Sequence, residues 1–196
     1  MSIVRDSARA IRMTLVLWVL TAIVYPVVML AIGLLFPYQA NGSIVESLQG
    51  QPIGSALIGQ AFSSERYFVS RPSAVGYSSE KGAAPTGVSG ASNLAPSNPK
   101  LLEDVKARVQ QLQEDGIQPN ADLVYTSGSG LDPHITIDSA LAQVERIAKV
   151  RNLSPDQIVP LINEHTQHRF LGIFGEPGVN VLNLNRELDI LQAAKQ

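Results

Sequence analysis

Apolar residues are concentrated near the N-terminus of the chain. Residues 13–36 (MTLVLWVLTAIVYPVVMLAIGLLF) contain no charged residue, and in a helix they would rise about 36 Å at 1.5 Å per residue. The hydrocarbon core of a bilayer is about 30 Å thick, so this segment is long enough to span it with a slight tilt. A signal peptide has a shorter apolar core of about 7–15 residues followed by small residues, whereas Tyr38 stands near the end of this one. The pattern therefore predicts an uncleaved transmembrane helix over residues 13–36.

The charges on either side of this segment predict its direction. Three arginines and one aspartate precede it, whereas residues 37–53 contain Glu46 as their only charged residue. Flanks rich in Lys and Arg remain on the cytoplasmic side of a membrane. We therefore expect residues 1–12 to be a short cytoplasmic N-terminus and residues 37–196 to form an extracytoplasmic domain.

One face of the predicted helix carries polar and aromatic residues. Thr14, Trp18, Thr21 and Tyr25 are spaced by four, three and four residues, which places them on one side of an α-helix. Pro26 removes a backbone hydrogen bond beside them. Two interpretations remain open. The face holds an interfacial Trp and a locally satisfied Tyr hydroxyl, or it contacts the transmembrane helices of another protein.

Beyond the apolar segment, the periodicity predicts a mixture of helices and short strands. The clearest helix has Asn98 as its cap, Pro99 at its first position and Gly116 at its end. Further helices are expected after a cap at Asp138, from Ser154-Pro155 onward, and from residue 185 to the C-terminus. Strands are expected at residues 55–62, 67–69, 121–126 and 179–182.

The order of these elements predicts the fold class. They show no regular βαβ alternation and no internal repeat, which favours one α+β (irregular α/β) domain behind a single N-terminal transmembrane helix. Residues 70–98 are rich in Ser, Gly, Ala and Pro. We interpret them as a long loop, and loops of this length are usually functional or disordered.

Composition excludes several functional classes. The chain has no Cys, so it has no disulfide, thiolate nucleophile or zinc–thiolate site. Its 15 Lys and Arg are mixed with 17 Asp and Glu, and nucleic-acid binding requires clustered basic residues. His165 and His168 are three residues apart without a third ligand nearby, so no metal site is predicted.

One short run gathers residue types that occur in hydrolases. Residues 127–134 (SGSGLDPH) contain Ser, Asp and His, but the members of a catalytic triad normally come from separate elements. A tight turn in which Asp132 accepts hydrogen bonds from backbone amides ahead of Pro133 is the favoured interpretation, and no catalytic residue is assigned. An anchored hydrolase that uses Asp132 and His134 is the enzymatic alternative. A free-standing membrane-anchored binding module is the other alternative.

Six ordered segments carry more specific motifs. They are residues 54–62 (GSALIGQAF), 67–73 (YFVSRPS), 89–100 (SGASNLAPSNPK), 121–135 (ADLVYTSGSGLDPHI), 164–169 (EHTQHR) and 175–184 (GEPGVNVLNL). Together they resemble the C subunit of the bacterial Kdp-type high-affinity potassium-transporting ATPase. The resemblance implies an accessory, non-catalytic subunit in the bacterial inner membrane, with a potassium-channel-like pore subunit and a P-type ATPase subunit as partners. It also implies a role in assembly and stability, and as a catalytic chaperone that raises the affinity of the ATPase subunit for ATP.

The same resemblance suggests a place for nucleotide. Residues 88–92 (VSGAS) are similar to the signature loop of ABC ATPases without its final Gln, which makes Ser89, Gly90 and Ser92 candidates for contact with ATP within the complex. The expected topology places them outside the cell, where ATP is scarce. We therefore expect the domain to cap the outer mouth of the channel-like subunit and to act on ATP affinity through the membrane helices. The candidate partner contacts are Thr14, Trp18, Thr21, Tyr25, Ser127, Gly128, Ser129, Gly130, Asp132 and His134.

Overall fold

The computed structural model describes residues 3–77 and 88–194. The chain divides into two compact units, Met1–Ser43 and Ile44–Gln196. Part of the loop predicted at residues 70–98 falls on residues 78–87, which lie outside the described residues. The described parts of that loop contain no helix or strand before α4, in agreement with the prediction.

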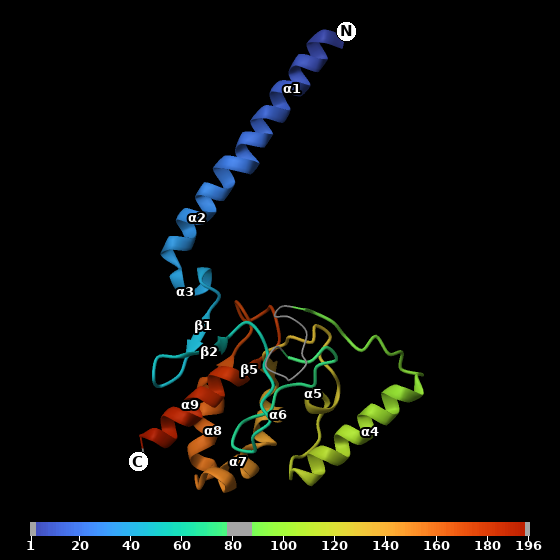
Figure 1. Ribbon diagram of the computed structural model, residues 1–196, viewed down its shortest axis with the longest axis vertical. Helices are drawn as coiled ribbons and strands as arrows, with labels where there is room; N and C mark the ends of the chain where they lie inside the picture. The colour runs from blue at the N-terminus through green and yellow to red at the C-terminus, as the bar shows by residue number, and fades with distance from the viewer. Residues whose placement is uncertain (1–2, 78–87, 195–196) are drawn as a thin grey trace. The chain divides into compact units, whose positions relative to one another are not determined.

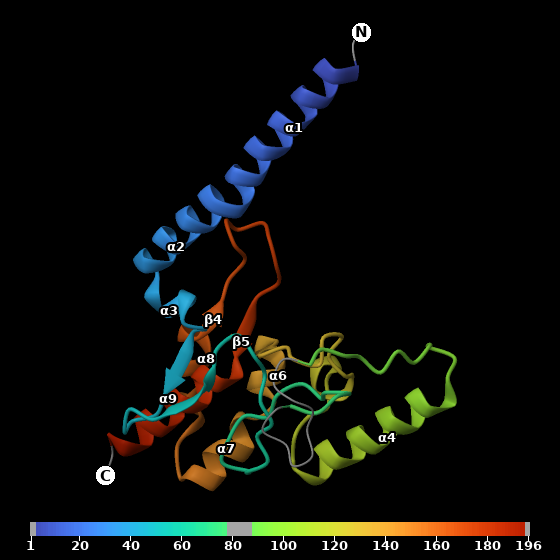
Figure 2. The ribbon, with the colours of Figure 1, turned by 45° about the horizontal axis from the view of Figure 1, so that its top comes forward.

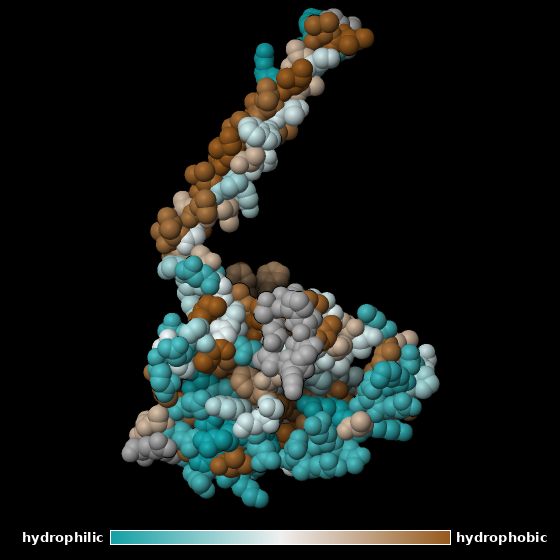
Figure 3. All heavy atoms as spheres, viewed as in Figure 1, coloured by the Kyte–Doolittle hydropathy of each residue, from teal (hydrophilic) through white to brown (hydrophobic). Residues whose placement is uncertain are grey.

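The first unit is one long helix followed by a short one. α1 (Ile3–Val19), a π-helical turn (Leu20–Val24) and α2 (Tyr25–Leu35) run on continuously, and α3 (Pro37–Ala40) follows (Figure 1). By length and composition the 33-residue helix Ile3–Leu35 is able to cross a membrane. Its most apolar 18-residue stretch is not buried within the chain. Figure 3 shows hydrophobic side chains along most of this helix, whereas the visible face of the second unit is largely hydrophilic. The described helix begins at Ile3, about ten residues before the span that the sequence predicts.

The helix is not regular across the predicted polar face. The amide of Tyr25 donates to the carbonyl of Leu20, five residues earlier, as in a π-helix. Pro26 follows directly, and a proline ring clashes with the carbonyl four residues before it in a regular α-helix. The wider turn is a common way to accommodate such an interruption. Thr21 lies inside this turn, and its hydroxyl donates to Leu17 O at 2.8 Å.

The second unit contains two small antiparallel sheets. β1 (Ile44–Glu46) pairs with β2 (Pro52–Ser55). In the other sheet β5 (Gly178–Asn180) is central, between β3 (His134–Ile135) and β4 (Thr166–Gln167). Every strand pair among the described residues is antiparallel, so the helices do not serve as parallel crossovers. The mixed helix-and-sheet domain that the sequence predicts is confirmed.

Helices pack around the second sheet to form the core. α6, α7 and α9 all contact α8, and Figure 1 shows them gathered beside β5, while α4 lies at the flank of the domain. The largest fully buried side chains include Ile147, Ile158, Ile162, Leu184 and Leu188. The helices of this unit are α4 (Pro99–Glu114), α5 (Ala121–Val124), α6 (Ile137–Leu141), α7 (Val144–Arg151), α8 (Pro155–Glu164) and α9 (Val181–Ala193).

Two of the predicted helix starts are confirmed and a third is wrong. Asn98 caps α4 through its side chain, and Ser154 forms a reciprocal capping box with Gln157 at the start of α8. The cap of α6 is Thr136 and not Asp138, which lies within the first turn. The reason is local, because Thr136 has an extended backbone and its hydroxyl accepts a hydrogen bond from an amide of that turn.

One predicted strand is instead mainly a short helix, and another is correct only in its first half. Residues 121–126 begin with α5, because the side chain of Asn120 accepts from Leu123 N and caps a short helix. Residues 179–182 were expected to be a strand, but β5 ends at Asn180, whose side chain caps α9. α9 therefore begins four residues earlier than predicted. Apolar spacing did not reveal either cap.

The two remaining predicted strands are largely irregular. Of residues 55–62, only the first belongs to β2. Residues 67–69 lie outside every described strand. The side-chain amide of Gln143 accepts from Val69 N at 2.8 Å and donates to Val69 O at 3.3 Å. The amide of Asn185 pairs in the same way with Phe68. Side chains from the residue before α7 and from α9 thus bind this segment where a neighbouring strand was expected.

Candidate functional site

Five of the six segments that carry the resemblance meet in one group of loops. The centre of this group is residues 127–134, here called the 127–134 loop. It receives backbone or hydroxyl hydrogen bonds from residues 54–62, 67–73, 89–100 and 175–184, and donates one to residues 67–73. These bonds include Gly59 N to Leu131 O at 2.8 Å, Gly90 N to Ser129 O at 2.9 Å, Ser73 Oγ to Gly130 O at 2.8 Å, Val181 N to Pro133 O at 3.0 Å and Ser127 N to Pro72 O at 2.9 Å.

Gly130 packs closely against the backbone of a neighbouring segment. Its φ is +69°, and a Cβ built on it would lie 2.5 Å from Gly90 O and 2.7 Å from Val75 Cγ2. A larger residue there would be strained in its backbone and would also collide with the neighbouring loop. Gly128 has open space around it. The two glycines of the motif therefore have different roles.

The two serines of the loop are used to close its turn. Ser127 is almost fully buried, and its hydroxyl accepts from Gly130 N at 3.2 Å. The hydroxyl of Ser129 accepts from Leu131 N at 3.1 Å and lies 3.2 Å from that of Ser127. Short hydroxyl-to-backbone bonds of this kind stabilise tight turns. Their function in this loop is structural.

The nucleotide candidates lie against the same loop. The hydroxyl of Ser89 and the amide of Gly90 both donate to Ser129 O, each at 2.9 Å. Ser92 is half-buried. A phosphate group would have to displace the two bonds of Ser89 and Gly90 before these groups became ligands.

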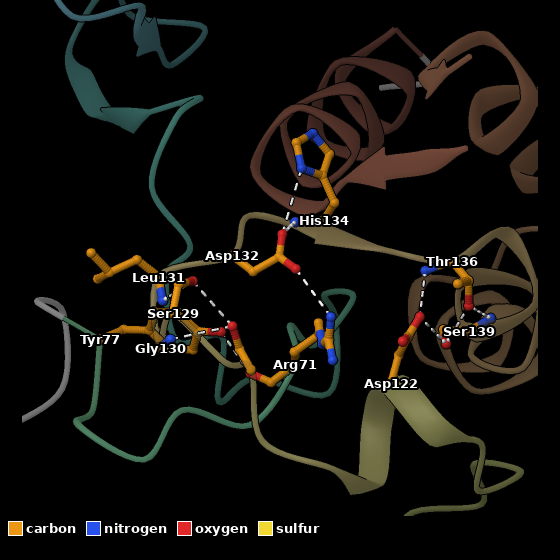
Figure 4. Close-up of polar contacts among 11 residues, drawn as sticks. Arg71, Tyr77, Asp122, Ser129, Gly130, Leu131, Asp132, His134, Thr136 and Ser139 are labelled. Carbon is orange, nitrogen blue, oxygen red and sulfur yellow. Dashed lines mark hydrogen bonds and ion pairs between the residues drawn. The ribbon is translucent and has the colours of Figure 1, made fainter. Parts of the chain in front are cut away.

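Asp132 connects the 127–134 loop to a neighbouring arginine. Its Oδ1 accepts from His134 N at 3.0 Å, which is the turn that the sequence predicts ahead of Pro133. Its Oδ2 lies 3.1 Å from Arg71 Nη1, and its Oδ1 lies 3.6 Å from His134 Nδ1 (Figure 4). Both oxygens of the carboxylate are therefore engaged.

The environment of Asp132 favours its charged form. Burial by itself would raise the pKa of this carboxyl. The hydrogen bonds from the side chain and the backbone of His134, together with the charge of Arg71, outweigh burial and lower the pKa below its ordinary value of 3.8. The carboxylate is therefore held ionised at neutral pH.

A cavity of about 430 Å³ opens beside this pair. Arg71, Asp132 and His134 form one part of its wall, and Gln167, Glu176 and Gly178 form another. Two buried nitrogens in the wall, Arg71 Nε and His134 Nε2, have no hydrogen-bond partner among the described residues. Charged side chains of both signs stand in its wall, while apolar surface makes up the larger part of its lining.

A hydrolase at this position would need a nucleophile that His134 can activate. No described hydroxyl forms a hydrogen bond with the ring of His134, and Figure 4 shows this ring pointing away from Ser129. Asp132 also comes from the same turn as His134. The arrangement therefore offers a charged turn and a cavity with charged side chains in its wall, without a nucleophile next to the histidine in residues 3–77 and 88–194.

Sequence reasoning missed two groups of this region. Arg71 comes from the segment YFVSRPS, and only the fold brings it to Asp132. The carboxylate of Asp122 accepts from Thr136 N at 2.8 Å and from Ser139 Oγ at 3.3 Å, which supports the start of α6 (Figure 4). The only sequence signal for Arg71 was that it belongs to the motif YFVSRPS. No local signal linked Asp122 to Thr136.

The other candidate set lies on the helix of the first unit. Thr14, Trp18, Thr21 and Tyr25 are all exposed in this chain. The hydroxyl of Thr21 is satisfied by Leu17 O. The hydroxyl of Tyr25 makes no hydrogen bond within the part of the chain that the structure describes. Local hydrogen bonding is therefore seen for the hydroxyl of Thr21 and not for that of Tyr25 among the described residues, and both interpretations of this face stay open.

Comparisons with known proteins cover both units. The family model described as "K+-transporting ATPase, c chain" matches residues 7–190. A potassium-transporting ATPase KdpC subunit of Anabaena sp. (strain L31) is 60% identical over 191 residues, which are 97% of this chain and 96% of the relative. The corresponding protein of Synechocystis sp. is 58% identical over 187 residues, 95% and 98% of the two chains. That of Caldanaerobacter subterraneus is 45% identical over 194 residues, 96% and 95% of the two chains.

Proposed function

Because the chain belongs to the KdpC family of K⁺-transporting ATPase c chains, we propose that it is an accessory, non-catalytic subunit of an ATP-driven potassium uptake complex. The observation that carries this proposal is the match over residues 7–190, which includes both the long helix and the domain. The engaged hydroxyls and carboxylate of the 127–134 loop support a role in holding a surface in shape. The chain would act in the assembly and stability of the complex.

The helix Ile3–Leu35 is proposed to anchor the subunit in the bacterial inner membrane. Its length, its apolar composition and its fully exposed surface support this role. The arginines before residue 13 support a cytoplasmic N-terminus, with residues 37–196 outside. Because the chain has no Cys, Ser7→Cys and Leu102→Cys give two single labelling sites. In intact cells, a membrane-impermeant maleimide should label only the second site, and labelling of only the first would overturn the orientation.

The partners in this proposal are a potassium-channel-like pore subunit and a P-type ATPase subunit. The exposed face of Thr14, Trp18, Thr21 and Tyr25 would contact their membrane helices. The domain would cap the outer mouth of the pore subunit through the 127–134 loop and the cavity beside it. Any effect on ATP affinity would then be a coupling between distant sites.

Two measurements test this arrangement. The affinity of the ATPase subunit for ATP is measured in the complex purified with and without the chain, and it should fall without the chain. A photoreactive ATP analogue added to sealed, correctly oriented vesicles from the outside should not label the domain. Labelling of the domain that competes with ATP would contradict the proposed coupling and would favour direct contact through Ser89, Gly90 and Ser92.

A further inference from the structure

The connection between β4 and β5 is a hairpin with an apolar tip. Phe170 N donates to Phe174 O at 2.8 Å, and Phe174 N donates to Phe170 O at 3.0 Å. Leu171 and Gly172 turn the chain with φ values of +53° and +74°. Figure 2 shows this connection extending away from the body of the second unit. The sequence FLGIF thus forms the end of a projecting hairpin.

The side chains of this tip are unusually exposed for their type. Phe170, Leu171, Ile173 and Phe174 are 70%, 74%, 71% and 61% exposed. The first three are the most exposed large apolar side chains among the described residues of Ile44–Gln196, and they match Leu30 of the apolar helix at 72%. A leucine with positive φ is also uncommon. A cluster of exposed apolar side chains marks a surface that binds something.

A charged pair closes the base of the tip. Arg169 Nη2 donates to both carboxylate oxygens of Glu176, at 2.9 and 2.7 Å. Arg169 directly precedes the apolar tip, and Glu176 follows Phe174 after one glycine. An apolar end followed directly by charged groups is the arrangement of segments that sit at the boundary between lipid chains and head groups.

We propose that residues 170–174 enter the bilayer interface and form a second membrane contact of this subunit. The proposal rests on the proposed anchoring by Ile3–Leu35. Only residues 41–43 separate α3 from β1, so the domain begins within roughly 15 Å of chain from the end of that helical segment. A domain tethered this closely has a high effective concentration at the lipid surface.

The chemistry of the tip favours lipid over a protein partner. Protein interfaces combine apolar contacts with about one hydrogen bond per 100–200 Å² of area. Residues 170–175 read FLGIFG, so the tip carries no polar side chain between Arg169 and Glu176. Its polar groups are those of the backbone. Acyl chains require no hydrogen bonds from the side chains that enter them.

The lack of Cys allows a direct test in the full chain. Ile173→Cys, Leu102→Cys and Leu30→Cys give single sites at the tip, on exposed α4 and in the apolar helix. Each variant carries an environment-sensitive fluorophore and is reconstituted alone into vesicles of phosphatidylcholine and phosphatidylglycerol. Lipids with a quencher on the upper acyl chain should quench the label at position 173 about threefold more than that at position 102. Iodide in the water should show the opposite order.

A second change separates insertion of the tip from insertion of the fluorophore. Leu171→Asp in the Ile173→Cys background places a charge in the tip, and Asp tolerates positive φ. It should lower quenching by lipid at position 173 about threefold, to the level at position 102, because a carboxylate is costly to move into lipid. Leu102→Asp in the same background should leave quenching unchanged. Equal quenching with and without Leu171→Asp would overturn the proposal.

The remaining outcomes distinguish the two proposals. If the label at position 30 is quenched by lipid while that at position 173 behaves like that at position 102, the anchor is correct and the hairpin contact is overturned. If position 173 becomes shielded only after the other subunits are added, the tip binds protein and the lipid contact is overturned. If position 30 is not quenched by lipid, the anchoring itself is overturned, and the hairpin proposal with it.

Discussion

The side-chain amide of Asn185 forms two hydrogen bonds with the backbone of Phe68, 117 residues away. Its Oδ1 accepts from Phe68 N at 2.8 Å, and its Nδ2 donates to Phe68 O at 3.0 Å. Both residues are buried. This pair performs in the core the task that a neighbouring strand performs in a sheet, because it satisfies both backbone groups of one residue.

Asn185→Ala should therefore destabilise the domain strongly. The substitution leaves a buried amide and a buried carbonyl of Phe68 without partners, and each such group costs about 1–3 kcal/mol. We expect the free energy of unfolding to fall by about 2–4 kcal/mol. The measurement is urea unfolding of the full chain in mild detergent, followed by far-UV circular dichroism.

Asn163→Ala is the matched control for this prediction. Asn163 is also a helical asparagine, but it is exposed near the end of α8. Its replacement should change the free energy of unfolding by less than about 0.5 kcal/mol. Equal effects of the two substitutions would mean that the amide pair with Phe68 contributes nothing.

Local sequence signals predicted some elements of the fold but not the contacts between distant segments. α4 was predicted because its cap at Asn98 and its stop at Gly116 are local signals. Residues 67–69 have the apolar pattern of a strand, but they pair with no strand. Val69 and Phe68 are bound by the side chains of Gln143, just before α7, and of Asn185 in α9, and no local pattern encodes these hydrogen bonds.

In the candidate site, too, the local contact was predicted and the long-range contact was not. The turn from Asp132 to His134 was predicted because Asp followed by Pro forms a local hydrogen bond. The ion pair with Arg71 was not predicted, since 61 residues separate the partners. The apolar tip at residues 170–174 was not predicted, although its residues form an uncharged run between Arg169 and Glu176. Whether that run was buried or exposed was decided by the hairpin.

The two glycines of the 127–134 loop should respond differently to alanine. Gly130→Ala adds a Cβ that would lie 2.5 Å from Gly90 O, at a residue with φ of +69°. Gly128→Ala adds one with nothing within 4 Å. We expect the first to lower the free energy of unfolding by about 2 kcal/mol or more, from backbone strain and collision together.

The expected change for Gly128→Ala is within about 0.5 kcal/mol of zero. Urea unfolding measures both variants under the same conditions. A second measurement is the retention of the ATPase subunit on a tagged chain in mild detergent, which should fall for Gly130→Ala if the loop contacts a partner. Similar stability of the two variants would show that residues 88–92 move aside without cost.

The lowered pKa of Asp132 predicts a pH dependence of stability. A carboxyl whose pKa is lower in the folded chain contributes stability above its unfolded value, and that contribution is lost as the pH falls through the folded pKa. At pH 7, Asp132→Asn should therefore lower the free energy of unfolding by about 1 kcal/mol. The difference should shrink as the pH falls below the ordinary value of 3.8.

Thermal unfolding at pH 7 and at a pH below 3.8 tests this sign. Asp104→Asn is the control, because Asp104 and Lys100 form an ion pair that is largely exposed. Its effect should stay within about 0.5 kcal/mol at either pH. A difference between Asp132→Asn and the unsubstituted chain that does not change with pH would mean that the amide loses packing and not charge.

Tyr25 provides the sharpest test of the membrane contact. Its hydroxyl has no partner among the described residues, and a hydroxyl without a partner is costly in hydrocarbon. If a helix of another subunit supplies the acceptor, Tyr25→Phe removes one interhelical hydrogen bond of about 0.6–1.7 kcal/mol. Retention of the ATPase subunit on the tagged chain should then weaken by roughly three- to twentyfold, from the same energy.

Controls on the same helix decide between the two interpretations of its polar face. Leu20→Val and Val27→Ile change the shape of the helix slightly and remove no polar group, so they should retain the partner as well as the unsubstituted chain does. Thr21→Leu removes a hydroxyl that is satisfied within the chain by Leu17 O, so its loss should be smaller than that of Tyr25→Phe. If all four variants retain the partner equally, Trp18 is an ordinary interfacial anchor and the face of the helix that carries Tyr25 meets lipid.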